Sequence, residues 1–181
     1  MLLFRKIDET RWAGKGYLES ASVTELNTTD NELSVWMYDG TVEEIDLGLA
    51  FILTQKCFKD ICCVKIPDAE LEAKNLQLRQ ENSGTPYIEM QPYHTNIRVP
   101  TAKELCKLAG IIYELYQDHQ NTCKYFTETD LKMHFYKKLA ENKIEIDFKS
   151  SKNQEKWRVI KEMQSTMGVI DFSKLTNVIS K

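Results

Sequence analysis

Glycine, proline and histidine are scarce in this chain of 181 residues, which contains seven glycines, four prolines and three histidines. The glycines form neither a Gly-x-Gly-x-x-Gly pattern nor a Walker A pattern, so nothing supports nucleotide binding through those loops. A Gly-x-Ser-x-Gly elbow is also absent, and His94, His119 and His134 lie in polar surroundings. The sequence therefore contains no recognisable arrangement for nucleophilic catalysis.

Long hydrophobic runs are missing as well. No stretch approaches the roughly 18 consecutive apolar residues of a membrane-spanning helix. The opening Met1–Arg5 is too short for the hydrophobic region of a signal peptide and has no basic lead. The five cysteines are odd in number and lie mostly inside apolar runs, as is typical of reduced thiols that pack as small hydrophobic groups. We therefore expect a soluble, cytoplasmic, bacterial protein without membrane contact.

Repeated short spacings of metal ligands do not occur either. Cys57, Cys62 and Cys63 can supply thiolates, but zinc sites normally combine two closely spaced pairs. Adjacent Cys62 and Cys63 on a strand would point to opposite faces of the sheet, where they cannot easily share one ion. The sequence predicts no metal site and no cofactor.

The net charge is small, at -3, and gives no strong field that would gather nucleic acid or anionic lipid. Residues 1–100 carry 10 Lys+Arg against 16 Asp+Glu, a net of -6, and residues 101–181 carry 14 against 11, a net of +3. This asymmetry is compatible with two structural units, although a difference of this size usually reflects solvated surface.

A strand, a turn and a helix are predicted between Asn31 and Gln55. Residues 32–38 alternate in the period of a strand with one buried face. Thr41 and Glu44 match a capping box, and the apolar stripe after them predicts a buried helix. The β-rich segment 61–66 follows, so the order of elements indicates a βαβ or related crossover in which 61–66 returns beside the first strand.

Other strands are predicted over residues 2–7, 22–26 and 94–99, and a small one over 143–149. After Pro100 the signals are mainly helical. Capping patterns begin helices at Thr101 and Thr127, apolar spacing predicts a helix over 153–167, and Asp171 begins a short terminal helix.

These elements predict an α/β or α+β fold, with a small mixed sheet and packed helices in the N-terminal two-thirds and a mainly helical C-terminal part. We divide the chain into an α/β body, residues 1–120, and a helical unit, residues 121–181. The second unit can equally pack on the body to form a single domain.

A metal-dependent hydrolase or nuclease would need clustered carboxylates with a nearby lysine. Two strings combine these residue types: Asp68, Glu72 and Lys74, and Glu145, Asp147 and Lys149. On a helix, Glu72 and Lys74 would point about 200 degrees apart. The second string alternates with apolar residues, as expected for the solvated side of a half-buried strand. Hydrolysis is therefore the weaker of two alternative functions.

The stronger alternative is a nucleic-acid-associated regulator, antitoxin-like or repressor-like. The C-terminal part contains many basic side chains with aromatic residues between them, and phosphate contact would use Lys137, Lys138, Lys149, Lys152, Lys156 and Arg158. Acidic residues interrupt this set, and lysine outnumbers arginine, which base reading would favour.

The leading hypothesis is a non-enzymatic protein-interaction or regulatory component that binds a partner protein or itself. It rests on the absence of a catalytic arrangement and on four large aromatic residues near loops and strand faces, the residue types that anchor interfaces. The predicted contact residues are Trp12, Trp36, Tyr87 and Tyr93.

Overall fold

The computed structural model describes residues 1–13, 20–26, 28, 30–80, 85–146, 150 and 153–167. Its internal contacts divide the chain into two compact units built from interleaved segments. Unit 1 contains Met1–Val42, Ile61–Ser83 and Pro92–Tyr125, and unit 2 contains Glu43–Asp60, Gly84–Gln91 and Phe126–Lys181. The division made from the sequence, into an α/β body (residues 1–120) and a helical unit (residues 121–181), stays a prediction.

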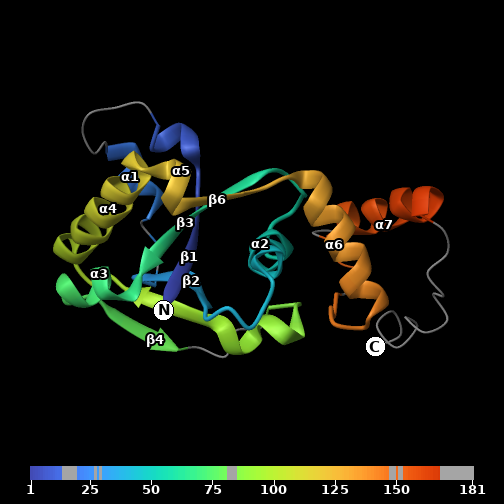
Figure 1. The fold of residues 1–181 in the computed structure, drawn as a ribbon, viewed down its shortest axis with the longest axis horizontal. Helices are drawn as coiled ribbons and strands as arrows, with labels where there is room; N and C mark the ends of the chain where they lie inside the picture. Colours follow the sequence, from blue (N-terminus) through green and yellow to red (C-terminus); the bar gives the residue numbers. More distant parts are fainter. Residues whose placement is uncertain are drawn as a thin grey trace. The chain divides into compact units, whose positions relative to one another are not determined.

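A six-stranded sheet forms the body of unit 1, although Phe126, the last residue of one strand, is counted with unit 2 (Figure 1). Its strands are β1 (Leu2–Ile7), β2 (Glu32–Tyr38), β3 (Ile61–Pro67), β4 (Gln77–Gln80), β5 (His94–Arg98) and β6 (Cys123–Phe126). Their order across the sheet is β4-β5-β2-β1-β3-β6. The strand β1 is antiparallel to both β2 and β3, and β5 is antiparallel to both β2 and β4. With helices beside an antiparallel sheet, the predicted α+β fold is confirmed, although the sheet is not mixed.

The crossover from β2 to β3 differs from the prediction in one respect. Because β1 pairs with both strands, β2 and β3 run in the same direction but are not neighbours. The expectation that residues 61–66 return directly beside β2 was therefore wrong. Pairing between distant segments depends on contacts that the local pattern of either segment does not contain.

The helix α4 (Ala102–Gln117) covers one face of this sheet (Figure 1). Leu108 and Ile112 of α4 are fully buried in one apolar cluster with side chains from five strands, among them Leu3, Val35 and Val64. The predicted capping box at Thr101 is confirmed: its side chain accepts from the Glu104 amide, while Glu104 Oε2 accepts from the Thr101 amide at 3.0 Å. Unit 1 also contains the shorter helices η1 (Glu9–Arg11), α1 (Ser20–Glu25), α3 (Asp68–Ala73) and α5 (His119–Thr122).

Two local predictions were wrong. The strand expected over residues 22–26 is largely the helix α1, which contacts α4 and whose Ser22 hydroxyl donates to the Arg11 carbonyl. The helix after β2 begins later than expected, because the Thr41 amide and hydroxyl donate to Asp39 Oδ1. Its capping box is formed by Glu43 and Asp46.

Unit 2 is mainly helical in its described part. It contains α2 (Glu44–Leu53), most of η2 (Ile88–Tyr93), α6 (Glu128–Ala140) and α7 (Gln154–Met167). The helix α2 packs against α6, and α6 packs against α7. The helices expected from Thr127 and over 153–167 are thus confirmed. Of the strand expected over 143–149, the described residues form a single bridge, between Ile144 and Tyr87. Residues 147–149 and the helix expected at Asp171 lie outside the described residues.

Candidate functional site

The four predicted contact aromatics lie in different environments. Trp12 and Trp36 are each 2% exposed, and Tyr87 is fully buried. The Trp12 Nε1–H donates to Glu25 Oε2 at 2.6 Å, and Trp36 packs edge-on against His94. The half-buried Tyr93 shares a hydrogen bond with the Thr41 hydroxyl at 2.8 Å. Most of these rings therefore contact the protein's own residues, and their role toward a partner stays a prediction.

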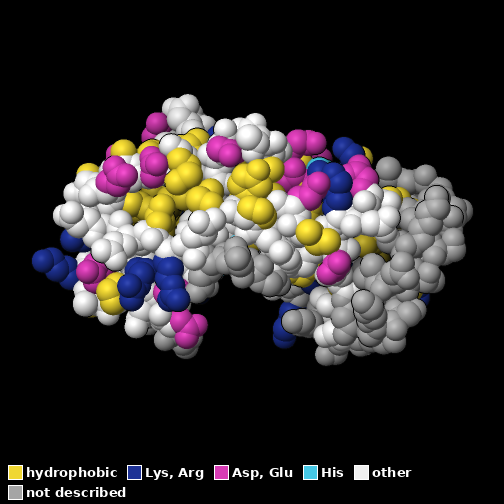
Figure 2. All heavy atoms as spheres, turned by 90° about the horizontal axis from the view of Figure 1, so that it is seen from below, with side chains coloured by type: hydrophobic (Ala, Val, Ile, Leu, Met, Phe, Trp, Pro, Cys, Tyr) yellow, Lys and Arg dark blue, Asp and Glu magenta, His cyan; other side chains and the backbone are white. Residues whose placement is uncertain are grey.

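The basic residues of the nucleic-acid alternative do not form one exposed surface within the described residues. Lys138 and Lys156 are buried, and the Lys156 ammonium donates to the Gln55 carbonyl at 2.7 Å. Arg158 forms ion pairs with Glu155 and Glu162, and Lys137 is exposed. The remaining two, Lys149 and Lys152, lie outside the described residues. Figure 2 shows basic and acidic side chains interspersed on the face that it displays.

The carboxylates of the hydrolase alternative also have structural roles or solvent around them. Asp68 Oδ1 accepts from the amino terminus at 3.3 Å and from the Ala69 amide at 2.9 Å. Glu72 and Glu145 are exposed, and Asp147 lies outside the described residues. Among the residues that the structure describes, no three His, Cys, Asp or Glu side chains are placed to hold one metal ion.

A buried ionic cluster in unit 2 was not predicted from the sequence. Its centre is Asp46 on α2, which is 4% exposed. Oδ1 of Asp46 accepts from the Tyr87 hydroxyl, lies 2.6 Å from His134 Nε2 and lies 3.3 Å from Lys138 Nζ. Oδ2 accepts from the Glu43 amide at 3.2 Å. We call Asp46, Tyr87, His134 and Lys138 the Asp46 cluster.

The surroundings keep the Asp46 carboxylate ionised. Burial by itself would raise the pKa of Asp46, but the hydrogen bonds from His134 and Tyr87 and the charge of Lys138 outweigh burial and hold the pKa well below its usual range. Burial and the hydrogen bond to Asp46 raise the pKa of Tyr87. A fully hydrogen-bonded carboxylate of this kind ties together the three segments that supply its partners.

One part of this cluster has a sequence signal. His134 and Lys138 are four residues apart and therefore lie on one face of a helix, beside apolar Leu131 and Phe135. Two polar residues on a buried face require a partner, but Asp46 lies 88 residues before His134. The sequence thus indicates that His134 and Lys138 need a buried polar partner. The spacing of residues along the chain does not identify Asp46 as that partner.

A second candidate site is the outer edge of the sheet in unit 1. The strand β4 is the last in the sheet order and pairs with β5 on one side. No described strand pairs with its other side, and all four of its residues are exposed. Leu78 is 37% exposed, which makes it one of the large hydrophobic residues that are open to solvent. We call Gln77–Gln80 the β4 edge.

An ion pair fixes the β4 edge to the interior of the sheet. Arg79 reaches across β5 to Glu32 on β2, with Nη1 2.8 Å from Glu32 Oε1. Glu32 also accepts from the Asn96 side chain at 3.0 Å. The hydrogen bond from Arg79, with that from Asn96, lowers the pKa of Glu32. The strand therefore has a defined position although its side chains are solvated.

Comparisons of the chain with models of protein families, with curated proteins and with solved structures found no match. In the part of the chain that the structure describes, none of the helices is long and apolar enough to cross a membrane. Functional inference therefore depends on the geometry of the chain itself.

Proposed function

We propose that the protein is a non-enzymatic interaction component, which binds a partner protein or a second copy of itself by adding a strand to the sheet of unit 1. The observation that carries the proposal is the β4 edge, an ordered outer strand with four exposed residues. Strand addition uses backbone hydrogen bonds for affinity and alternate side chains for specificity.

The composition of the β4 edge supports this role. Outer strands that avoid association usually contain proline, lysine or an inward-pointing charge. Gln77–Gln80 has the sequence Gln-Leu-Arg-Gln, with neither proline nor lysine, and its one charge is paired with Glu32. Leu78 supplies an apolar side chain that an incoming strand would cover. The absence of proline and lysine from the β4 edge and the exposed Leu78 both favour pairing with an incoming strand.

Substitution of Leu78 tests the proposal. Leu78→Lys places a lysine on the edge and removes the apolar contact, so we expect association to weaken about tenfold, which corresponds to about 1.4 kcal/mol. The matched control is Met133→Lys, at an exposed position on α6 in unit 2, and it should leave association unchanged. Self-association is measured by sedimentation velocity, and retention of a stoichiometric partner by co-purification from native lysate.

Two results would contradict the proposal. One is a wild-type protein that neither self-associates nor retains a stoichiometric protein. The other is an association that Leu78→Lys and Met133→Lys weaken equally. Circular dichroism and thermal unfolding of each variant establish that the change acts on binding and not on folding.

A further inference from the structure

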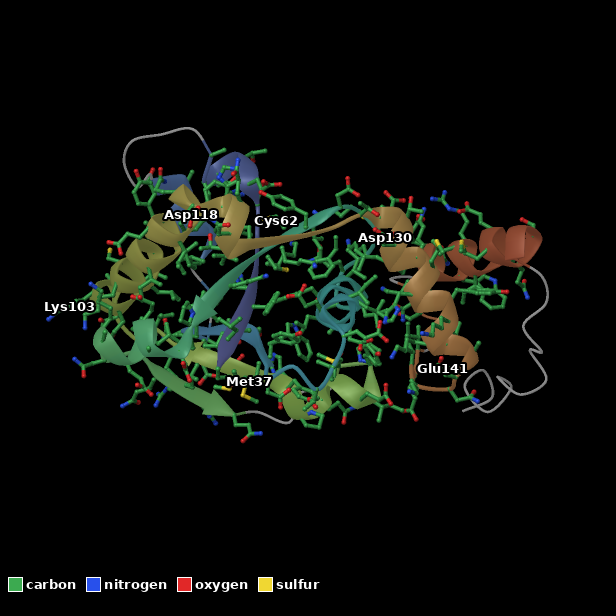
Figure 3. The ribbon with its side chains drawn as sticks, viewed as in Figure 1. Met37, Cys62, Lys103, Asp118, Asp130 and Glu141 are labelled. Carbon is green, nitrogen blue, oxygen red and sulfur yellow. The ribbon has the colours of Figure 1, made fainter. Side chains whose placement is uncertain are left out.

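Two cysteines in unit 1 lie together on neighbouring strands. Cys62 is on β3 and Cys123 is the first residue of β6, which is next to β3 in the sheet (Figure 3 labels Cys62). Both side chains belong to the apolar cluster under α4, so they project from the same face of the sheet. Both are free thiols, and each side chain shifts the pKa of the other. Separate segments of the chain thus bring two reduced thiols onto neighbouring strands and the same face of the sheet.

The two thiols are not equivalent. The side chain of Cys62 lowers the pKa of Cys123 although burial opposes this shift, and the charge of Lys65 also lowers it. The side chain of Cys123 and burial raise the pKa of Cys62. Since the thiolate is the reactive form, the lower pKa favours Cys123 as the thiol of the pair that reacts first.

An exposed tyrosine lies on the same strand as one cysteine of the pair. Cys62 and Cys123 are 3% and 7% exposed, but Tyr125, two residues along β6 from Cys123, is 46% exposed. The Tyr125 hydroxyl donates to Glu9 Oε1 at 2.8 Å, and the Tyr116 hydroxyl donates to the same oxygen at 3.2 Å. Buried Cys123 is therefore two residues from a solvent-exposed position of β6.

We propose that Cys62 and Cys123 form an oxidation site that closes to a disulfide when a peroxide reaches it. The Cys123 thiolate attacks one peroxide oxygen, the O–O bond breaks, and Cys123 becomes a sulfenic acid with release of one water after protonation. The Cys62 sulfur then attacks the Cys123 sulfur, the S–O bond breaks, and a second water leaves. The two thiols lose two electrons and two protons, and one hydrogen peroxide takes them up and is reduced to two waters.

The other three cysteines are placed differently from the pair. Cys57 and Cys106 are exposed, and Cys63 is buried next to Cys62 in the sequence. Adjacent residues on a strand point to opposite faces, so the Cys63 side chain projects away from the pair.

The test begins with a Cys57→Ser/Cys106→Ser variant, which removes the exposed thiols and leaves Cys62, Cys63 and Cys123. After treatment with hydrogen peroxide and denaturation, we expect loss of two titratable thiols, a mass decrease of two hydrogens and a peptide that links Cys62 to Cys123. Adding Cys123→Ser should abolish the link, whereas adding Cys63→Ser should preserve it. Dithiothreitol should restore both thiols.

Persistence of all three thiols under peroxide would overturn the proposal. A disulfide between Cys62 and Cys63, or addition of oxygen to Cys123 without a link to Cys62, would overturn it equally. Should a variant fail to fold, peptide mapping of the oxidised wild-type protein gives the same decision, because the linked peptide identifies its two cysteines directly.

Discussion

At the scale of single residues, Asp46 shows how one buried carboxylate becomes a source of stability. An isolated buried charge is costly, but this one has hydrogen-bond donors on both oxygens and a lysine beside it. Removal of the carboxylate would leave buried His134 without its hydrogen-bond partner and would leave Lys138 with the half-exposed Glu89, 3.7 Å away, as its remaining anion. The Asp46 cluster therefore stabilises unit 2 as long as Asp46 is ionised.

We predict that Asp46→Asn lowers the free energy of unfolding by about 3 kcal/mol at neutral pH, as for other buried pairs that lose one partner. The pKa of Asp46 is lowered by folding, so its contribution is fully present above the unfolded value of about 4 and declines as the pH falls toward the folded value. Urea unfolding of both proteins at several pH values measures the difference, which should shrink below about pH 4. A difference that stays constant down to about pH 2.5 would contradict this role for the carboxylate.

At the scale of elements, the two helix-interior glycines at positions 48 and 110 are in opposite situations. A Cβ on Gly48 of α2 would lie 2.8 Å from Cγ of Phe126, within unit 2. A Cβ on Gly110 of α4 would meet nothing within 4 Å. The first glycine permits close packing, whereas the second only weakens its helix.

Alanine at the two positions should therefore have effects of opposite sign. Gly48→Ala should destabilise the protein by about 1 to 3 kcal/mol, because the ring of Phe126 must move. Gly110→Ala should stabilise it by about 0.5 to 1 kcal/mol through helix propensity. Chemical unfolding followed by circular dichroism measures both. Equal effects of the two substitutions would show that Phe126 does not pack on Gly48.

Elements with local signals were predictable, and those that depend on distant contacts were not. The starts of α4 and α6 followed from Thr101 and Thr127, because a capping side chain and the amide that donates to it are three residues apart. The sequence of α1 predicts a strand, because the formation of this helix depends on its packing against α4. Three features join residues that are far apart in the chain. They are the position of β1 between β2 and β3, the β4 edge, and the contact of Asp46 with His134. No periodicity encodes such pairings.

At the scale of the whole molecule, the charge of the protein favours the proposed protein binding over the alternative, binding of nucleic acid. The net charge is -3, and Lys138, Lys156 and Arg158 are engaged with the protein's own groups. Phosphate binding requires cations that are free to replace condensed counterions. Two of the six residues predicted for nucleic acid are buried, which reduces the available positive charge.

We therefore predict no retention of duplex DNA or RNA in filter binding at about 0.15 M salt. The measurement is a salt series with the wild-type protein and with Lys137→Glu, which changes an exposed position of the predicted set. Retention that falls steeply as salt rises, and that Lys137→Glu reduces, would favour the alternative function instead.

The central claim is that an incoming strand pairs with the β4 edge. The most direct test is backbone hydrogen exchange of Gln77–Gln80, compared between the dilute free protein and the associated or partner-bound protein. The β4 amides that point away from β5 should exchange at least about tenfold more slowly in the complex, because each gains a hydrogen-bond acceptor. Amides of α7 should exchange at the same rate in both states. Equal exchange of the β4 amides in the two states, with protection elsewhere, would contradict strand addition at this edge.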